Sequence, residues 1–143
     1  MKTMKFFAAM CCAAIVFAFT GCSKDNAKDI IGSWSLQSTT VTETFNGQSH
    51  TETETLEEGE SSIYTFNEDN SYSNVITYDG QSYTRTGTYS ISGDKLTINT
   101  VDFDGEAETY TCTVKIDGND MTLTFTESQN GFTITEVSSL KRI

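Results

Sequence analysis

From Ile30 to its last residue, the chain is a series of short segments in which apolar and polar residues alternate, and each segment closes at a turn signal. The signals fall at Asn46-Gly47, Glu58-Gly59, Asn67 to Asn70, Asp79-Gly80, Ser92-Gly93-Asp94, Asp102 to Gly105, Asp117 to Asp120 and Gln129-Asn130-Gly131. Asn-Gly and Asp-Gly supply the positive φ angles that tight hairpins demand. These eight turns imply about nine strands, or eight if one turn is a bulge or an irregular loop.

Within the segments the side chains follow a period of two. Met121, Leu123 and Phe125 point one way, and the threonines between them point the other way. Threonine suits a wet strand surface, because its branched Cβ fits the pleat and its hydroxyl faces water. Consecutive hairpins with one buried face form either a sandwich or a closed barrel. The absence of long crossover loops favours an all-β, antiparallel up-and-down meander that closes into a barrel of eight to nine strands.

The first residues differ from everything that follows. Lys2 and Lys5 precede an apolar run, Phe6 to Phe19, and small residues lead to Cys22. The run is too short and wrongly flanked for a membrane span. A core helix is the alternative, but the abrupt polar stretch SKDNAKD argues against it. We therefore predict a cleaved signal helix over residues 1–21, a lipidated tether over 22–29 and one barrel domain over 30–143.

The residues FTGC before and at Cys22 resemble the lipobox of bacterial lipoproteins, with Phe19 in place of the usual leucine. The resemblance implies a diacylglycerol on the sulfur of Cys22 and a further acyl chain, such as palmitate, on its amine. Several chains anchor a protein stably, whereas one chain alone is marginal. Ser23 after the cysteine resembles outer-membrane lipoproteins. We expect a lipid-anchored protein of the bacterial outer membrane, and leave open whether it faces the periplasm or the cell surface.

Charge and composition argue against several functions. Removal of Lys2 and Lys5 takes the net charge from −11 to −13, so we expect no nucleic acid among the partners. With a single His50, and Cys112 alternating with apolar residues, the sequence shows no Ser-His or Cys-His system and no Gly-rich phosphate loop. We expect no enzyme and no cofactor.

A metal site is weighed for the segment HTETETLEE, where His50, Glu52 and Glu54 share one face. Metal sites usually draw ligands from more than one element and have outer hydrogen-bond support. We therefore interpret this segment as a solvated acidic edge strand and predict no metal.

Three stretches, DIIGSWSLQS, GTYSISGDKLTI and NDMTLTFT, resemble the lipocalin-like domain of small bacterial lipoproteins, a member of the lipocalin-like β-barrel family. In that family a Gly-x-Trp on the first strand places the indole across the closed barrel end, against an arginine from the last strand. The resemblance assigns Gly32, Trp34 and Arg142 to this barrel base, with Lys141 as the neighbouring choice. A core tryptophan without an arginine partner is the alternative.

One charged residue lies on an otherwise apolar face. Arg85 shares its parity with Tyr83, Tyr89 and Ile91, while the residues between them are serine or threonine. If this face is the interior, the guanidinium needs a partner there. We hypothesise a cavity in which Arg85, with Tyr72, Tyr83, Tyr89 or Tyr110, orients a small amphiphile that carries a carboxylate. The alternative pairs Arg85 with a carboxylate of the chain, or places it at the solvated mouth; the carboxylates are Glu52, Glu54, Glu108 and Glu136.

Two functions follow. The first is a cell-envelope lipoprotein whose lipocalin-like barrel binds a small hydrophobic or amphiphilic ligand. The second is a non-catalytic interaction or structural module of the outer membrane with a filled core. An eight-stranded barrel is just wide enough either to be filled by its own side chains or to hold one small ligand, so the fold permits both. Besides this possible ligand, the sequence predicts one partner, the membrane, which the protein contacts through the lipid on Cys22.

Overall fold

The computed structural model describes residues 26–101 and 104–143, and in this part of the chain one helical turn precedes nine strands. The predicted signal segment and Cys22 lie outside the described residues. The elements are α1 (Asn26–Asp29), β1 (Gly32–Phe45), β2 (Gln48–Thr55), β3 (Ser61–Phe66), β4 (Ser71–Tyr78), β5 (Gln81–Ser92), β6 (Lys95–Val101), β7 (Ala107–Asp117), β8 (Asp120–Gln129) and β9 (Phe132–Arg142).

Each predicted turn falls between two consecutive strands, which confirms the segmentation. Two of the hairpins show why Asn-Gly and Asp-Gly favour a tight turn. Asn46 and Gly47 have φ angles of 50° and 79°, and Asp79 and Gly80 have φ angles of 50° and 73°. Two successive positive φ angles give a turn whose twist matches that of the flanking strands.

The strands close into an antiparallel barrel of eight strands, with β2 as an additional strand outside it. The hydrogen-bonded order is β2-β1-β3-β4-β5-β6-β7-β8-β9, and β9 returns to β1. One edge of β1 pairs with β3 over Gly32–Ser35 and with β2 over Ser38–Phe45. The all-β meander barrel is therefore confirmed, and β2 departs from a simple meander because β1 is long enough to pair with two strands.

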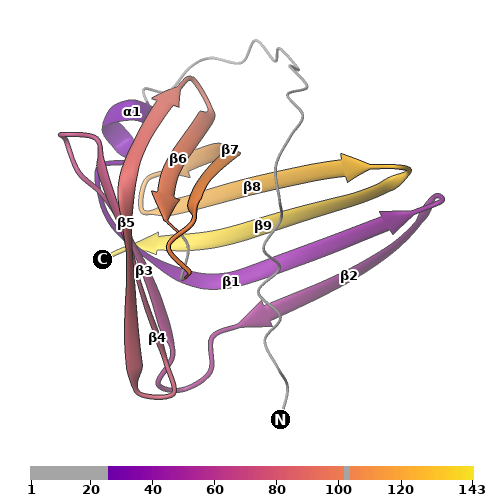
Figure 1. Cartoon of the computed structure of the whole chain (residues 1–143), viewed down its shortest axis with the longest axis horizontal. Helices are drawn as coiled ribbons and strands as arrows, with labels where there is room; N and C mark the ends of the chain where they lie inside the picture. The colour runs from indigo at the N-terminus through magenta and orange to yellow at the C-terminus, as the bar shows by residue number, and fades with distance from the viewer. Residues whose placement is uncertain (1–25, 102–103) are drawn as a thin grey trace.

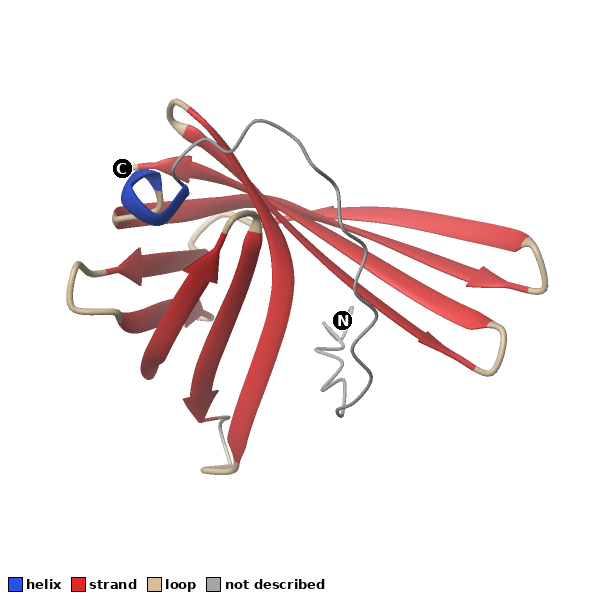
Figure 2. Cartoon of the chain, turned by 90° about the horizontal axis from the view of Figure 1, so that it is seen from above, coloured by secondary structure: helices blue, strands red, loops and turns tan. Residues whose placement is uncertain are grey.

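The strands β2, β1, β9 and β8 continue beyond the barrel as a four-stranded extension, which we call the wing (Figures 1 and 2). The wing consists of residues 39–45, 48–54, 123–129 and 132–138, and at its base residues 123–124 still pair with β7. Pairing between β7 and β8 covers only 113–117 with 120–124, so the rest of β8 separates from β7. The barrel is thus closed at one end and splayed at the other.

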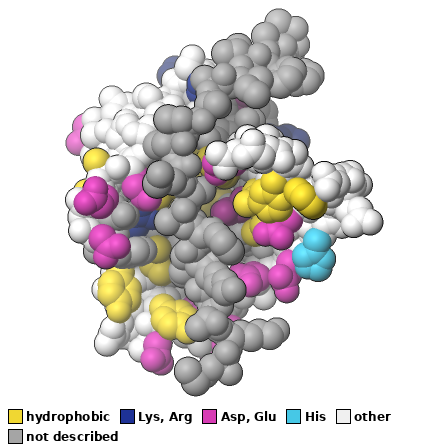
Figure 3. Space-filling view, turned by 45° about the vertical axis from the view of Figure 1, so that its right-hand side comes forward, with side chains coloured by type: hydrophobic (Ala, Val, Ile, Leu, Met, Phe, Trp, Pro, Cys, Tyr) yellow, Lys and Arg dark blue, Asp and Glu magenta, His cyan; other side chains and the backbone are white. Residues whose placement is uncertain are grey.

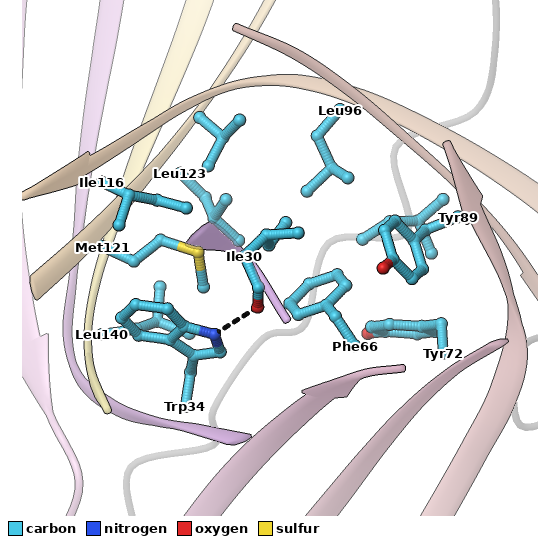
Figure 4. Packing of buried hydrophobic residues seen from close by; sticks show 12 residues of the cluster. Ile30, Trp34, Phe66, Tyr72, Tyr89, Leu96, Ile116, Met121, Leu123 and Leu140 are labelled. Carbon is cyan, nitrogen blue, oxygen red and sulfur yellow. Dashed lines mark hydrogen bonds between the residues drawn. The ribbon is translucent and has the colours of Figure 1, made fainter. Parts of the chain in front are cut away.

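A hydrophobic core fills the closed end (Figure 4). Its fully buried members include Trp34, Phe66 and Leu96, and Ile30 enters it from the turn after α1. Phe66 packs edge-on against Tyr89, with ring centroids 5.1 Å apart. Because side chains occupy this half, any site for a ligand lies toward the splayed half.

Candidate functional site

The closed end is sealed by Trp34 and Arg142, as the resemblance implied. The guanidinium carbon of Arg142 lies 4.1 Å from the centroid of the Trp34 ring, and the indole Nε1 donates to the carbonyl of Ile30 at 2.8 Å. Gly32 has a φ of +126°, and a Cβ there would lie 2.8 Å from Nη1 of Arg142. Glycine is therefore required by the backbone and by the close guanidinium. Arg142, rather than Lys141, fills the predicted position.

Arg85 points into the barrel and forms an ion pair there. Its Nη2 lies 2.6 Å from Oε2 of Glu108, and it donates to the hydroxyl of Tyr110 at 3.0 Å. Its Nε donates to the carbonyl of Val101, and the Tyr110 hydroxyl donates to Glu108. Of the alternatives left open by the sequence, the structure selects Glu108. We call Arg85, Glu108 and Tyr110 the mouth cluster.

The position of the mouth cluster follows from strand register. Arg85 lies on β5, whereas Glu108 and Tyr110 lie on β7, with β6 between them. On the interior face β6 presents Thr100, and the next interior residue of β5 is Gly87, which has no side chain. A long guanidinium can therefore cross β6 above these two small residues.

Burial shapes the electrostatics of the cluster. The side chains of Arg85 and Glu108 are 19% and 20% exposed, so water screens their attraction only in part. Burial lowers the pKa of Arg85, but the hydrogen bond to Tyr110 and the charge of Glu108 outweigh it and leave the pKa raised. Burial also raises the pKa of the Tyr110 hydroxyl. At neutral pH the cluster thus holds a charged guanidinium and a neutral phenol beside Glu108.

Two further tyrosines stand beside the cluster, below it toward the core. Tyr72 was predicted, and Tyr64 was not; their ring centroids are 6.4 Å apart. Burial raises the pKa of both hydroxyls, and the positive charge of Arg85 acts on both in the opposite direction. Tyr64 alternates with Ser62 and Phe66 in SSIYTF, so the parity that revealed Arg85 could also have revealed Tyr64.

The other two predicted tyrosines lie on β5, one on either side of Arg85. Tyr89 lies at the closed end, where its hydroxyl donates to the carbonyl of Asn67 at 2.8 Å. Tyr83 is 46% exposed near the tip of the β4–β5 hairpin, and its hydroxyl donates to Gln81. The structure therefore places Tyr110 and Tyr72 beside Arg85, Tyr89 in the core and Tyr83 at the rim.

A second polar group of the interior escaped the sequence interpretation. Asn74 is 3% exposed, and its Nδ2 donates to Oγ of Ser62 at 3.0 Å and to the carbonyl of Ile63. Asn74 pairs with Arg85 across β4 and β5, so it belongs to the same layer of the barrel. This layer is polar, in contrast to the apolar closed end.

The structure also locates the residues that were considered for a metal site and the cysteine of β7. His50, Glu52 and Glu54 are exposed on β2, as expected of an edge strand. Within residues 26–101 and 104–143, no group of three or more His, Cys, Asp or Glu side chains is arranged to hold a metal ion. The same residues include no helix with the length and apolarity to cross a membrane. Cys112 is half-buried in the interior, and burial raises the pKa of its thiol to about 12.

Chemically, the polar layer can exchange hydrogen bonds with a bound polar group. Arg85 and the tyrosine hydroxyls donate, Glu108 accepts, and the apolar core below prevents deep entry of water. A carboxylate could take the place of Glu108 at Arg85, and a hydroxyl could bridge Glu108 and a tyrosine. The arrangement thus offers both hydrogen-bond donors and an acceptor to a polar group.

Comparison with known proteins agrees with this geometry. Residues 30–123 match the family model for a lipocalin-like domain. A lipocalin-like protein from Bacteroides uniformis superposes with a TM-score of 0.50 at 19% identity, over 80% of this chain and 99% of that one. An uncharacterized protein from Bacteroides eggerthii gives a TM-score of 0.51 at 14% identity, over 80% and 100%. No curated protein matches significantly. At such identities the structural likeness supports the fold alone.

Proposed function

This chain belongs to the lipocalin-like domain family, and we propose that it is a lipid-anchored envelope protein whose barrel binds a small amphiphile. The observation that carries the proposal is the mouth cluster, a charged and phenolic group placed inside a barrel above an apolar core. Ligand sites of this kind combine apolar walls with a few oriented polar groups.

The proposed pose follows from which half of the barrel is filled. Because core side chains occupy the closed end, the acid group of the ligand binds at Arg85 and its apolar part extends toward the splayed half. There it meets Ile76 and Tyr83, which pair across β4 and β5 on the interior face. Binding exchanges the Glu108 carboxylate for that of the ligand, with Tyr110 as a second donor.

A titration of the purified protein with decanoate and a bile acid tests the proposal, with decanol as the neutral control. We expect Arg85→Met to weaken decanoate binding by about tenfold or more. Glu108→Gln removes the competing carboxylate and should strengthen it by about fivefold, because one close charge is worth about 1 kcal/mol. Neither change should affect decanol by more than about twofold.

If Arg85 recognises the acid of the ligand, Arg85→Met weakens decanoate binding and Glu108→Gln strengthens it. If the two residues form only a structural ion pair, loss of either one destabilises the barrel, and both variants change decanoate binding in the same direction. If the parent protein binds neither acid, the proposal is wrong. The alternative of a filled, non-catalytic interaction module would then account for the barrel. Native mass spectrometry of protein extracted from the envelope provides an independent measurement through any small molecule that co-purifies.

The anchoring part of the proposal concerns orientation. Asn26 of α1 donates through Nδ2 to the carbonyl of Gly93 at 3.0 Å, which holds the start of the domain at the closed end (Figure 1). Cys22 is four residues earlier, a span of at most about 14 Å. A lipid on Cys22 would therefore hold the closed end near the membrane and direct the splayed end away from it. Mass spectrometry of the parent and of Cys22→Ala, with membrane fractionation, tests this point.

A further inference from the structure

The two faces of the wing differ completely in chemistry. Strand register places the outer face in rows of hydroxyl side chains interrupted by one valine; these residues are Thr40, Thr42, Thr44, Ser49, Thr51, Thr53, Thr124, Thr126, Ser128, Thr133, Thr135 and Val137. Neighbouring hydroxyls bond to each other, as in Thr40 with Thr53 at 2.8 Å and Ser128 with Thr133 at 2.9 Å. The outer face is therefore uncharged, and most of its hydroxyl groups form hydrogen bonds with one another.

The inner face carries all the charges of the wing, and all of them are acidic. It combines the carboxylates Glu43, Glu52, Glu54, Glu127 and Glu136 with the apolar side chains Val41, Phe45, Phe125, Phe132 and Ile134, and includes His50. No lysine or arginine occurs in the wing. Figure 3 shows acidic side chains and the histidine around a hydrophobic group on this side of the molecule. A mixed surface of this kind complements a ligand that is both cationic and apolar.

A shallow hollow at the tip of this face has the chemistry to bind a cationic side chain. Glu43, Phe45, His50 and Phe132 line it, together with Gln48 and Ser49. The rings of Phe45 and Phe132 lie 6.5 Å apart at an interplanar angle of 55°, so they present two inclined aromatic faces. An ammonium or guanidinium group beside aromatic rings and a carboxylate gains both cation–π and ionic attraction.

The area and the charge of the inner face together indicate what kind of partner it binds. Four strands of seven residues span about 20 Å by about 14 Å, far less than the roughly 800 Å² that each partner buries in a stable protein complex. The area instead matches one helix of about 13 residues, which is about 20 Å long. A second copy of this chain is disfavoured, because the inner faces would bring like charges together and each chain has a net charge of −11.

We propose that the inner face of the wing binds a short cationic amphipathic peptide, with one lysine or arginine seated in the hollow between Phe45 and Phe132. Carboxylates on all four strands then pair with the cationic side of the peptide, while Val41, Phe125 and Ile134 contact its apolar side. The proposal does not depend on a ligand in the barrel.

The test titrates the purified full-length protein with a labelled Leu-Lys peptide of about 14 residues at helical spacing, and with the same peptide carrying Glu for Lys. The variant Glu43→Gln/Glu52→Gln/Glu127→Gln should weaken binding of the Lys peptide by about tenfold at low salt. The matched control Glu58→Gln/Asp79→Asn/Asp120→Asn changes the net charge equally outside the inner face, and should change affinity by less than about twofold.

Phe45→Ala should weaken binding by about fivefold, and Val101→Ala, also at an exposed hydrophobic residue, should leave it unchanged. Amide shift mapping on the parent protein gives a readout that does not depend on any variant, and we expect the shifts on β1, β2, β8 and β9. The proposal is overturned if the parent protein does not bind the Lys peptide or if the Glu peptide binds as well. Equal weakening in both triple variants, or shifts confined to β4–β6, would also overturn it.

Discussion

The substitution Arg142→Met tests whether a single guanidinium holds the closed end of the barrel together. Arg142 stacks on Trp34, and it donates to the carbonyl of Ile31 at 2.8 Å and to that of Asp29 at 2.5 Å. These carbonyls flank Ile30, whose side chain is fully buried. Methionine has enough length to cover the indole but cannot donate a hydrogen bond, so the substitution separates polar contacts from packing.

The expected cost can be estimated from the contacts. Each charged hydrogen bond is worth about 1 kcal/mol at this half-buried position, and the cation–π contact adds about 1 kcal/mol. We therefore expect Arg142→Met to lower the free energy of unfolding by about 3 kcal/mol. With a urea dependence of about 2 kcal/mol per molar, the unfolding midpoint should fall by about 1.5 M. Trp34 is the only tryptophan and is fully buried, so its fluorescence reports the transition.

Lys141→Met is the matched control, because Lys141 is the adjacent residue, carries the same charge and is exposed. Its midpoint should shift by less than about 0.3 M, as for most surface substitutions. Equal midpoints for the two variants would refute the sealing role of Arg142. A double-mutant cycle with Trp34→Phe, followed by far-UV circular dichroism, should give a coupling of about 1 kcal/mol between ring and guanidinium.

Three further predictions concern the barrel wall and interior. Gly87→Ala should destabilise the protein by about 3 kcal/mol in urea denaturation, because a Cβ there would lie 1.9 Å from the carbonyl oxygen of Asn99. The thiol of Cys112, with its pKa of about 12, should react with a maleimide roughly a thousandfold more slowly in the native protein than in urea; equal rates would contradict its burial. Burial raises the pKa of Glu136, so the folded state binds this proton more tightly than the unfolded state does. Stability should therefore decrease as pH rises from the ordinary value of 4.5 through the raised pKa, and Glu136→Gln should flatten that slope in thermal melts.

The sequence predicted the strands well because their limits are local. A residue pair such as Asn46-Gly47 determines where a hairpin turns, whatever the rest of the chain does. The partner of each strand is not local. The segment around His50 reads as an edge strand, but only the structure shows its partner, which is the part of β1 from Ser38 to Phe45 that lies beyond the pairing with β3.

The sequence predicted which residues of the candidate site share a strand face, but not which side chains pair with one another. Alternation grouped Arg85 with Tyr83, Tyr89 and Ile91 on one face, and the structure shows that this face is the interior. The choice of Glu108 among several carboxylates depended on the register of β5, β6 and β7 and on the small side chains between them. Tyr89, which parity also grouped with Arg85, lies at the closed end. Residues on one face of a strand share a side of the sheet, but four residues along the strand separate Arg85 from Tyr89 by about 13 Å.

The two proposed binding surfaces require opposite charges in their ligands, although both face the splayed end of the barrel. A fatty acid reaches Arg85 past the carboxylates on the inner face of the wing, so their field opposes its approach, and added salt should speed its association. The same field attracts a cationic peptide, whose association salt should slow. If both ligands respond to salt in the same direction, one of the two sites has been assigned to the wrong surface.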